Sequence, residues 1–385
     1  IRDCLLSRGL GDVYKRQIEW IVEKFGAFVS MTMKDGWLKD LVVDGIIGGV
    51  GSVLVFLPNI LLLYMFISLL EDSGYMARAA FIMDRLMHRI GLHGKSFIPM
   101  VMGFGCNVPA IMATRTIESR KSRLITTLII PLMSCAGRMP VYVLIAGAFF
   151  PKKAGLVLLG LYALGILLAI VAAKIMSLFF KEDDLPFVME LPPYRVPTGK
   201  SVFRHTWEKG RQYLQKMSGV ILICSLVIWF LGYFPNHDAY DSVQEQQEHS
   251  FIGYIGKSME PVLEPLGFDW RMGVGIVAGV GAKELVVSTL GVMYADDEPV
   301  SGAQDESGGP SSDTRLQRAL VKSVTPAGAL AYMVFILLYF PCIATFVAIK
   351  NESGGWKWAI ITAIYTVLLA WTAAFLTFRI AGLFL

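Results

Sequence analysis

Three cysteines share one sequence setting, because each lies where an apolar helix should break. Cys106 ends the run GFGC, Cys135 lies in MSCAGRMP, and Cys342 follows a proline in FPC. Glycine and proline interrupt helices, so each thiol should lie beside unwound backbone. Thiolates are ligands for soft and borderline metals, and a bound metal stabilises the thiolate form. The three positions predict a metal path, whereas Cys224, in an unbroken run, is expected only to pack.

Polar residues accompany these thiols inside apolar sequence. Glu284 stands in the middle of a predicted span, where a carboxylate normally pairs or lines a polar cavity. Asn107 and Ser134 each adjoin a cysteine and offer oxygen ligands beside the sulfur. A structural ion pair remains the alternative for Glu284.

Two further acids end the first long apolar run. Glu71 and Asp72 follow it directly in LLEDSGYMAR. They could attract cations at a pore mouth, or they could form an ordinary solvated helix end.

The composition favours a membrane protein. Hydrophobic residues make up 55% of the 385 residues, charged residues make up 17%, and the mean hydropathy is +0.56, values that soluble domains rarely show. The net charge of +4 is small, and the basic residues lie in short clusters between apolar runs, as they do beside lipid headgroups. We therefore expect the lipid bilayer, and no nucleic acid, as a partner.

Eight apolar stretches approach the length of a membrane helix, for which a bilayer core about 30 Å thick requires roughly 20 residues. They cover residues 45–70, 97–113, 124–150, 154–180, 218–234, 272–295, 327–349 and 356–378. The second and sixth are glycine-rich, and prolines interrupt the second and third. Broken backbone at membrane depth is tolerated only where protein or water satisfies its polar groups. The prediction is an all-α polytopic membrane protein with broken or re-entrant helices.

The broken stretches recur in two halves of the chain. Residues 103–107 (GFGCN) align with residues 279–283 (GVGAK), and the region around Cys135 aligns with that around Cys342. Corresponding broken helices in two repeats mark the binding site of many transporters. Residues 181–216 hold seven Lys and Arg against two in residues 235–271, which places the former in the cytoplasm and favours inverted repeats.

Four regions follow from this pattern. Residues 1–16 form a non-native or disordered leader, and residues 17–180 hold the first repeat with flanking helices. Residues 181–217 form a basic cytoplasmic linker, and residues 218–385 hold the second repeat with a C-terminal helix. Residues 295–315 are acidic and rich in Gly and Ser, which is typical of a flexible loop.

The chain resembles the ferrous iron transport protein B (FeoB) family in five runs: LEDSGYMARAAFIMDR, GKSFIPMVMGFGCNVPAIMATRT, PLMSCAGRMPVYVLIAGAFF, GVGAKELVVSTLGVMY and FILLYFPCIATFVAI. The resemblance extends from about Gln17 to the C-terminus, and GFGCNVPAIMATR is the most specific run. The family motif commonly reads MSCSARLPVY where this chain has MSCAGRMPVY, which keeps Cys135 and Arg138.

The resemblance implies two Gate-type repeats that carry Fe²⁺ into a bacterial cell across its inner membrane. It places Cys106 and Cys135 at positions proposed to guide or gate Fe²⁺, and Glu71 and Glu284 at acidic positions of the same motifs. It also implies an N-terminal G domain in cis that would bind GTP and Mg²⁺, accessory proteins FeoA and FeoC, and a homo-oligomer. These 385 residues show no nucleotide-binding motif, so we expect a fragment that is no enzyme and holds no permanent cofactor.

Two other functions use the same features. A Gate-type carrier could move an organic solute such as a nucleoside, and competition by divalent metals would argue against it. A membrane thiol-disulfide enzyme would need two of the thiols within bridging distance. Fe²⁺ stands low in the affinity order of divalent metals, and a conducting site must release its ion, so the metal path should bind weakly.

Overall fold

The structure is a computed structural model that describes residues 17–18, 20–31, 33, 36–179, 194–235, 243–294 and 312–384. The secondary structure of these residues is entirely helical, which confirms the predicted fold class. The chain divides into two compact units. Unit 1 draws its residues from Ile1–Tyr75 and Tyr194–Gly232, and unit 2 from Met76–Pro193 and Tyr233–Leu385.

Unit 1 is built from two long helices and shorter pieces before them. Its elements are α2 (Trp37–Asp40), the π-helical turn η1 (Leu41–Ile47), α3 (Gly48–Asp72) and α10 (Gly199–Tyr233). Helices α3 and α10 approach closely at Gly49, because a Cβ added there would overlap the side chain of Ser225. The predicted linker therefore contains the first half of α10, and its residues 181–193 lie outside the described residues.

Unit 2 holds the broken elements of both predicted repeats and the helices around them, in two sets. The first consists of α4 (Tyr75–Ile90), η2 (Gly94–Ser96), α5 (Phe97–Gly103), α6 (Asn107–Ala113), η3 (Thr114–Thr116), α7 (Arg120–Ile129), η4 (Ile130–Leu132), η5 (Ala136–Arg138), α8 (Met139–Phe149) and α9 (Ala154–Phe179). The second consists of α11 (Val243–Glu248), α12 (Phe251–Leu263), η7 (Glu264–Leu266), α13 (Trp270–Gly281), α14 (Leu285–Tyr294), α15 (Ser312–Ser323), α16 (Pro326–Leu338), α17 (Ile343–Ser353) and α18 (Trp356–Phe384).

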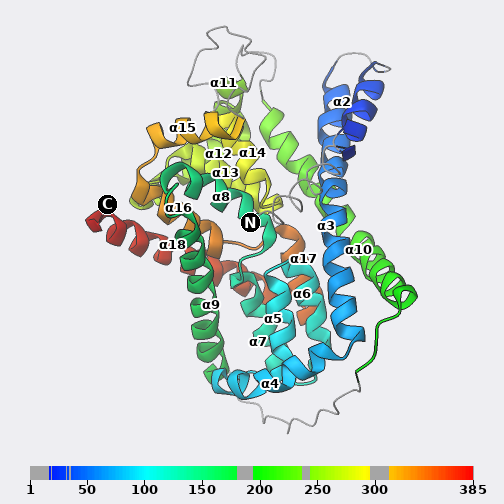
Figure 1. The fold of residues 1–385 in the computed structure, drawn as a ribbon. Coiled ribbons are helices and arrows are strands. Elements are labelled where there is room, and N and C mark those ends of the chain that lie inside the picture. The colour runs from blue at the N-terminus through cyan, green and yellow to red at the C-terminus, as the bar shows by residue number, and fades with distance from the viewer. Residues whose placement is uncertain are drawn as a thin grey trace. The chain divides into compact units, whose positions relative to one another are not determined.

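The packing pairs of the two repeats correspond. Helices α5 and α6 match α13 and α14, α7 matches α16, α8 matches α17, and α9 matches α18. The pairs α6·α17, α7·α17 and α7·α9 each have their counterpart in α14·α8, α16·α8 and α16·α18. In Figure 1, α6 lies beside α17, and α8 lies beside α14. This exchange of partners is what a two-fold relation between repeats produces, and their inverted orientation stays a prediction.

Capping residues fix where the half-helices start. Ser119, Asp269 and Thr325 accept hydrogen bonds from backbone N–H groups at the starts of α7, α13 and α16, as helix N-caps do. Pro131 and Pro140 lie in the first turns of η4 and α8, where a missing N–H does no harm. The prolines therefore begin new helical segments after each break.

The lengths of the helices agree with a membrane protein. Four helical stretches within the described residues are long and apolar enough to cross a bilayer: Arg120–Phe149, Ala154–Phe179, Pro326–Ser353 and Trp356–Leu383. Two further pairs of consecutive helices pass the same test jointly. Helices α5 and α6 have 7 residues each, about 10 Å apiece, so neither can span alone. They fit the predicted broken or re-entrant element.

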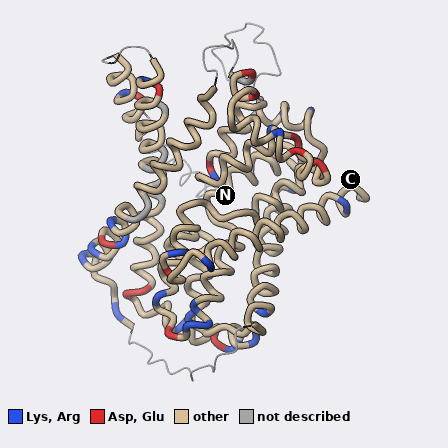
Figure 2. Tube along the Cα trace, turned by 180° about the vertical axis from the view of Figure 1, so that it is seen from behind, with Lys and Arg blue, Asp and Glu red and all other residues tan. Residues whose placement is uncertain are grey.

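Charge is distributed as a bilayer requires. Figure 2 shows Lys and Arg gathered around α4 and the start of α7, while long stretches of α9 and α18 carry no charge. Most of the surface of α9 and α18 is exposed, and it includes large apolar side chains such as Leu156, Leu159 and Leu368. Such apolar surface is stable against lipid tails and not against water. Unit 2 is therefore a multi-pass membrane unit.

Candidate functional site

Each of the three predicted cysteines is the residue that directly precedes a helical segment. Cys106 precedes α6, Cys135 precedes η5 and α8, and Cys342 precedes α17. Cys106 has an extended backbone with φ −151° and ψ 132°. Its repeat counterpart, Ala282, has φ −147° and ψ 137° at the end of α13. The same backbone break therefore occurs twice, as the aligned sequences predict.

The breaks meet one another inside unit 2. The backbone N–H of Ala136 donates to the carbonyl of Gly105 at 3.0 Å, which joins the Cys106 break to the Cys135 break. A Cβ placed on Gly137 would lie 2.5 Å from Oε1 of Glu284, so the Glu284 carboxylate rests against the same turn. Cys135, Cys342 and Glu284 all lie in the neighbourhood of Cys106. The structure thus brings together the four residues predicted from distant parts of the sequence.

The two predicted oxygen donors are buried beside these thiols. Asn107 is 4% exposed and Ser134 is 1% exposed. Neither Oδ1 of Asn107 nor Oγ of Ser134 has a partner in ordinary hydrogen-bond geometry within the described part of the chain, although the Tyr142 hydroxyl lies near Ser134. A buried polar atom without a partner costs about 1–3 kcal/mol. A structure retains that cost most readily where a ligand or water completes the site.

The cysteines of the site carry free thiols. Cys106, Cys135 and Cys342 are partly exposed, and none of the described cysteines forms a disulfide. Among the described residues, no group of three or more His, Cys, Asp or Glu side chains is arranged to hold a metal ion. The site is therefore a neighbourhood of candidate ligands without a closed coordination shell.

Two cationic side chains hold the backbone at the breaks. Arg138 is 0% exposed and donates to the carbonyls of Met133 at 3.0 Å and Pro131 at 3.1 Å. Lys283 is 4% exposed and donates to the carbonyl of Phe340 at 2.7 Å. Both cations satisfy carbonyls that the broken helices leave without an N–H partner. The family motif keeps Arg138, but its partners became visible only in three dimensions.

The predicted pore-mouth acids lie in unit 1. Glu71 Oε2 pairs with Lys209 Nζ at 2.6 Å, and Asp72 Oδ2 accepts a hydrogen bond from Ser201 Oγ at 3.1 Å. Both contacts join the end of α3 to α10. Within unit 1 these acids therefore take part in helix packing, and their role at a pore mouth stays a prediction.

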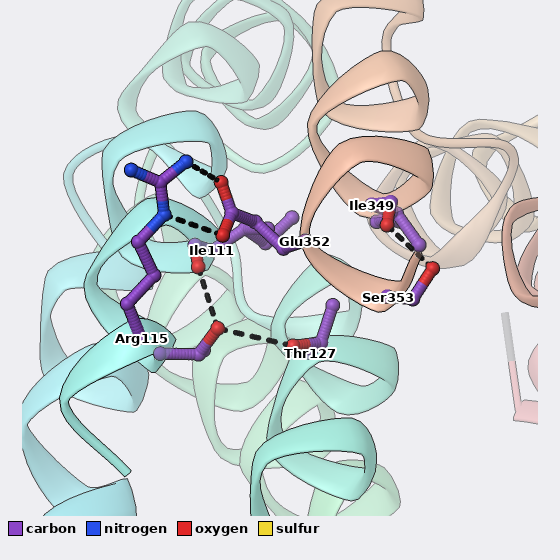
Figure 3. A network of polar contacts seen from close by, with 7 residues as sticks. Ile111, Arg115, Thr127, Ile349, Glu352 and Ser353 are labelled. Atoms are coloured by element: carbon purple, nitrogen blue, oxygen red, sulfur yellow. Dashed lines mark hydrogen bonds and ion pairs between the residues drawn. The ribbon is translucent and has the colours of Figure 1, made fainter. Parts of the chain in front are cut away.

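Sequence reasoning missed an ion pair between the repeats. Arg115, just after α6, forms a bidentate pair with Glu352 near the end of α17, and Nε lies 2.6 Å from Oε2 (Figure 3). Beside it, Thr127 Oγ1 donates to Thr114 Oγ1 at 3.2 Å, and Thr114 donates to the Ile111 carbonyl. The two charges are 237 positions apart, so no local pattern could reveal the pair.

Comparisons with known proteins agree with this architecture. The Gate family, described as nucleoside recognition, matches residues 53–149 and 214–356. A second family, described as ferrous iron transport protein B C terminus, matches residues 158–209. No solved structure matches the chain. The repeats, their breaks and these matches define a polytopic membrane protein of the Gate class.

Relatives narrow that class to one family. A Porphyromonas gingivalis protein named Fe(2+) transport protein A/Fe(2+) transporter FeoB fusion protein is 54% identical over 99% of this chain and 48% of its own length. A Campylobacter jejuni protein named Fe(2+) transporter FeoB is 40% identical over 99% of this chain and 62% of its own length. A Methanocaldococcus jannaschii protein of the same name is 42% identical over 92% of this chain and 52% of its own length. The chain belongs to the FeoB family. It spans about half to three fifths of the length of these relatives.

Proposed function

We propose that unit 2 forms a path along which ferrous iron crosses a bacterial inner membrane into the cell. One observation supports this proposal most: the three breaks that carry the cysteines lie near one another, and the Glu284 carboxylate lies against Gly137 beside them. The relatives whose names state Fe(2+) transport match nearly the whole chain, which supports Fe²⁺ as the ion.

The proposed ligands are sulfur and oxygen atoms at the breaks. Cys106, Cys135 and Cys342 supply sulfur, Glu284 supplies a carboxylate, and Asn107 and Ser134 supply buried oxygens. A mixed set of this kind suits a borderline ion such as Fe²⁺. An incomplete shell favours release over storage, which a transport path requires.

Control of the path would come from outside these residues. We propose that a G domain in cis binds GTP and Mg²⁺ in the intact protein, because the relatives are longer than the matched region. An FeoA-type partner is supported by the fusion named in Porphyromonas gingivalis. FeoC and a homo-oligomer are further partners that the resemblance implies.

Uptake of radioactive Fe²⁺ by cells that make the intact gene product tests the proposal. The variant Cys106→Ser with Cys135→Ser should abolish uptake while its amount in the membrane stays unchanged. Cys224→Ser in α10 is the matched control and should take up iron as the wild type does. Wild-type uptake by the double variant would refute the role of the thiols.

A nucleoside carrier is the second candidate, because the Gate family is described as nucleoside recognition. Competition separates the two functions in the same assay. Excess Zn²⁺ or Co²⁺ should inhibit Fe²⁺ uptake, and excess nucleosides should leave it unchanged. The reverse pattern, with uptake of labelled nucleoside, would support the second candidate.

A further inference from the structure

Lys283 is held at the second repeat's break in the manner of a bound cation. Its Nζ lies 2.7 Å from the carbonyl oxygen of Phe340, two residues before Cys342, and 3.1 Å from the centroid of the Tyr339 ring. A backbone carbonyl and the face of an aromatic ring both attract a positive charge. Burial and the neighbouring Arg138 disfavour the charged ammonium, whereas these two contacts and the neighbouring Glu284 favour it.

The first repeat solves the same problem differently. There the carbonyl two residues before Cys135 belongs to Met133, and it is held by Arg138 from its own break. In the second repeat the position equivalent to Arg138 is Thr345, whose hydroxyl contacts the Cys342 thiol at 3.1 Å. Lys283 therefore reaches across from the α13–α14 break to hold the carbonyl that Thr345 leaves open.

The position that aligns with Lys283 is also informative. In the first repeat it is Asn107, a neutral side chain with a buried oxygen that has no ordinary hydrogen-bond partner in the described residues. The first repeat thus offers the Asn107 oxygen as an acceptor for a cation, and the second repeat has the Lys283 side chain at the same position. The two repeats therefore differ in charge at this aligned position.

The charge of Lys283 acts on the candidate ligands directly. Cys135, Cys342, Glu284 and Arg138 all lie in its neighbourhood. A divalent ion bound beside these thiols would therefore be repelled by the ammonium. At low dielectric such repulsion is strong over several ångströms.

We propose that Lys283 is a positioning residue that acts as a tethered cation: it occupies the Phe340 carbonyl and weakens the hold of the breaks on the transported divalent ion, so that the ion is released. This inference rests on the proposed function. The long, flexible lysine stem lets the ammonium withdraw when an ion arrives and return as it leaves. The residue would thus set the balance between affinity and release.

The test compares Fe²⁺ uptake kinetics of Lys283→Gln and Lys283→Met in the intact gene product. Gln keeps an N–H donor for the Phe340 carbonyl without the charge, and Met removes both. Both variants should lower KM for Fe²⁺ about tenfold, which corresponds to about 1.4 kcal/mol of removed repulsion, and should lower the maximal rate because release becomes slow. Lys257→Gln is the control. Lys257 lies on α12 and pairs with Glu248 at the end of α11, so this variant should change neither KM nor the maximal rate.

The outcomes separate the inference from the proposed function. If the wild type takes up no Fe²⁺, the proposed function fails. If it does take up Fe²⁺ and Lys283→Gln has the wild-type KM, the inference is overturned and Lys283 only supports the backbone. Lys283→Gln is the deciding variant, because it preserves the donor if Lys283→Met reaches the membrane poorly.

Discussion

The ion pair between Arg115 and Glu352 gives the most quantitative prediction for the fold. It joins the end of α6 to the end of α17 (Figure 3), and both helices begin at a cysteine-bearing break. The perturbation is a double-mutant cycle with Arg115→Gln, Glu352→Gln and the combined variant. If the pair holds the two repeats together, its loss should lower the free energy of unfolding of unit 2.

The magnitude follows from exposure. The Arg115 side chain is 51% exposed, whereas that of Glu352 is 7% exposed. Arg115→Gln leaves a nearly buried carboxylate without its guanidinium and should cost about 2 kcal/mol. Glu352→Gln leaves an arginine that water can solvate and should cost about 1 kcal/mol. The double variant should cost about 1.5 kcal/mol, so the coupling energy is about 1.5 kcal/mol, more than exposed pairs give.

The assay is the thermal midpoint of the purified protein in detergent, followed by tryptophan fluorescence. About 2–4 °C per kcal/mol is expected for a unit of this size, so Arg115→Gln should lower the midpoint by about 4–8 °C. The pair Lys95–Glu118, whose glutamate side chain is 75% exposed, is the matched control and should show little coupling, because water solvates its charges. Additive costs at Arg115 and Glu352 would show that the pair does not connect the repeats.

Three further predictions follow from single contacts. Arg138→Lys should lower the thermal midpoint clearly at unchanged expression, because one ammonium cannot reproduce a planar guanidinium that serves two carbonyls; an unchanged midpoint would argue against the described hydrogen bonds. Gly137→Ala should abolish Fe²⁺ uptake because its Cβ would displace the Glu284 carboxylate, whereas Gly155→Ala, with open space around it, should leave uptake unchanged. Burial lowers the pKa of His93 below 6.5, so the unfolded chain binds the proton more readily than the folded protein. The stability of the fold should therefore decrease as the pH drops below about 6.5. His93→Asn should remove part of this acid sensitivity in melting curves recorded between pH 5 and 8.

The fold could be predicted largely from the sequence because its signals are local. All eight predicted apolar stretches coincide with helices. The second stretch breaks at its glycines as predicted, whereas Pro99 and Pro109 lie inside α5 and α6 and interrupt neither. Hydropathy gave the wrong start for α10, which begins at Gly199, well before the predicted stretch at 218. It also missed α4 and α12, because both helices are amphipathic. Their pattern satisfies helix packing without a long apolar run.

The sequence predicted which residues belong to the candidate site, but it could not predict the contacts between them. Repeat placement identified Cys106, Cys135 and Cys342, and the cost of a charge in an apolar span identified Glu284. The contact of Glu284 with Gly137 and the bond from Lys283 to Phe340 depend on how two distant repeats interlock. Such contacts have no local sequence signature, since a carbonyl acceptor is present in every residue.

The most direct test of the metal path is a spectroscopic titration of the purified intact protein with Co²⁺. Cobalt bound to thiolate gives a near-ultraviolet charge-transfer band that oxygen ligands alone do not give. We expect this band to appear at weak, saturable affinity, to disappear in Cys106→Ser with Cys135→Ser, and to persist in Cys224→Ser. A band that survives loss of both thiols, or no band at saturating Co²⁺, would contradict the assignment of these breaks as the ion path.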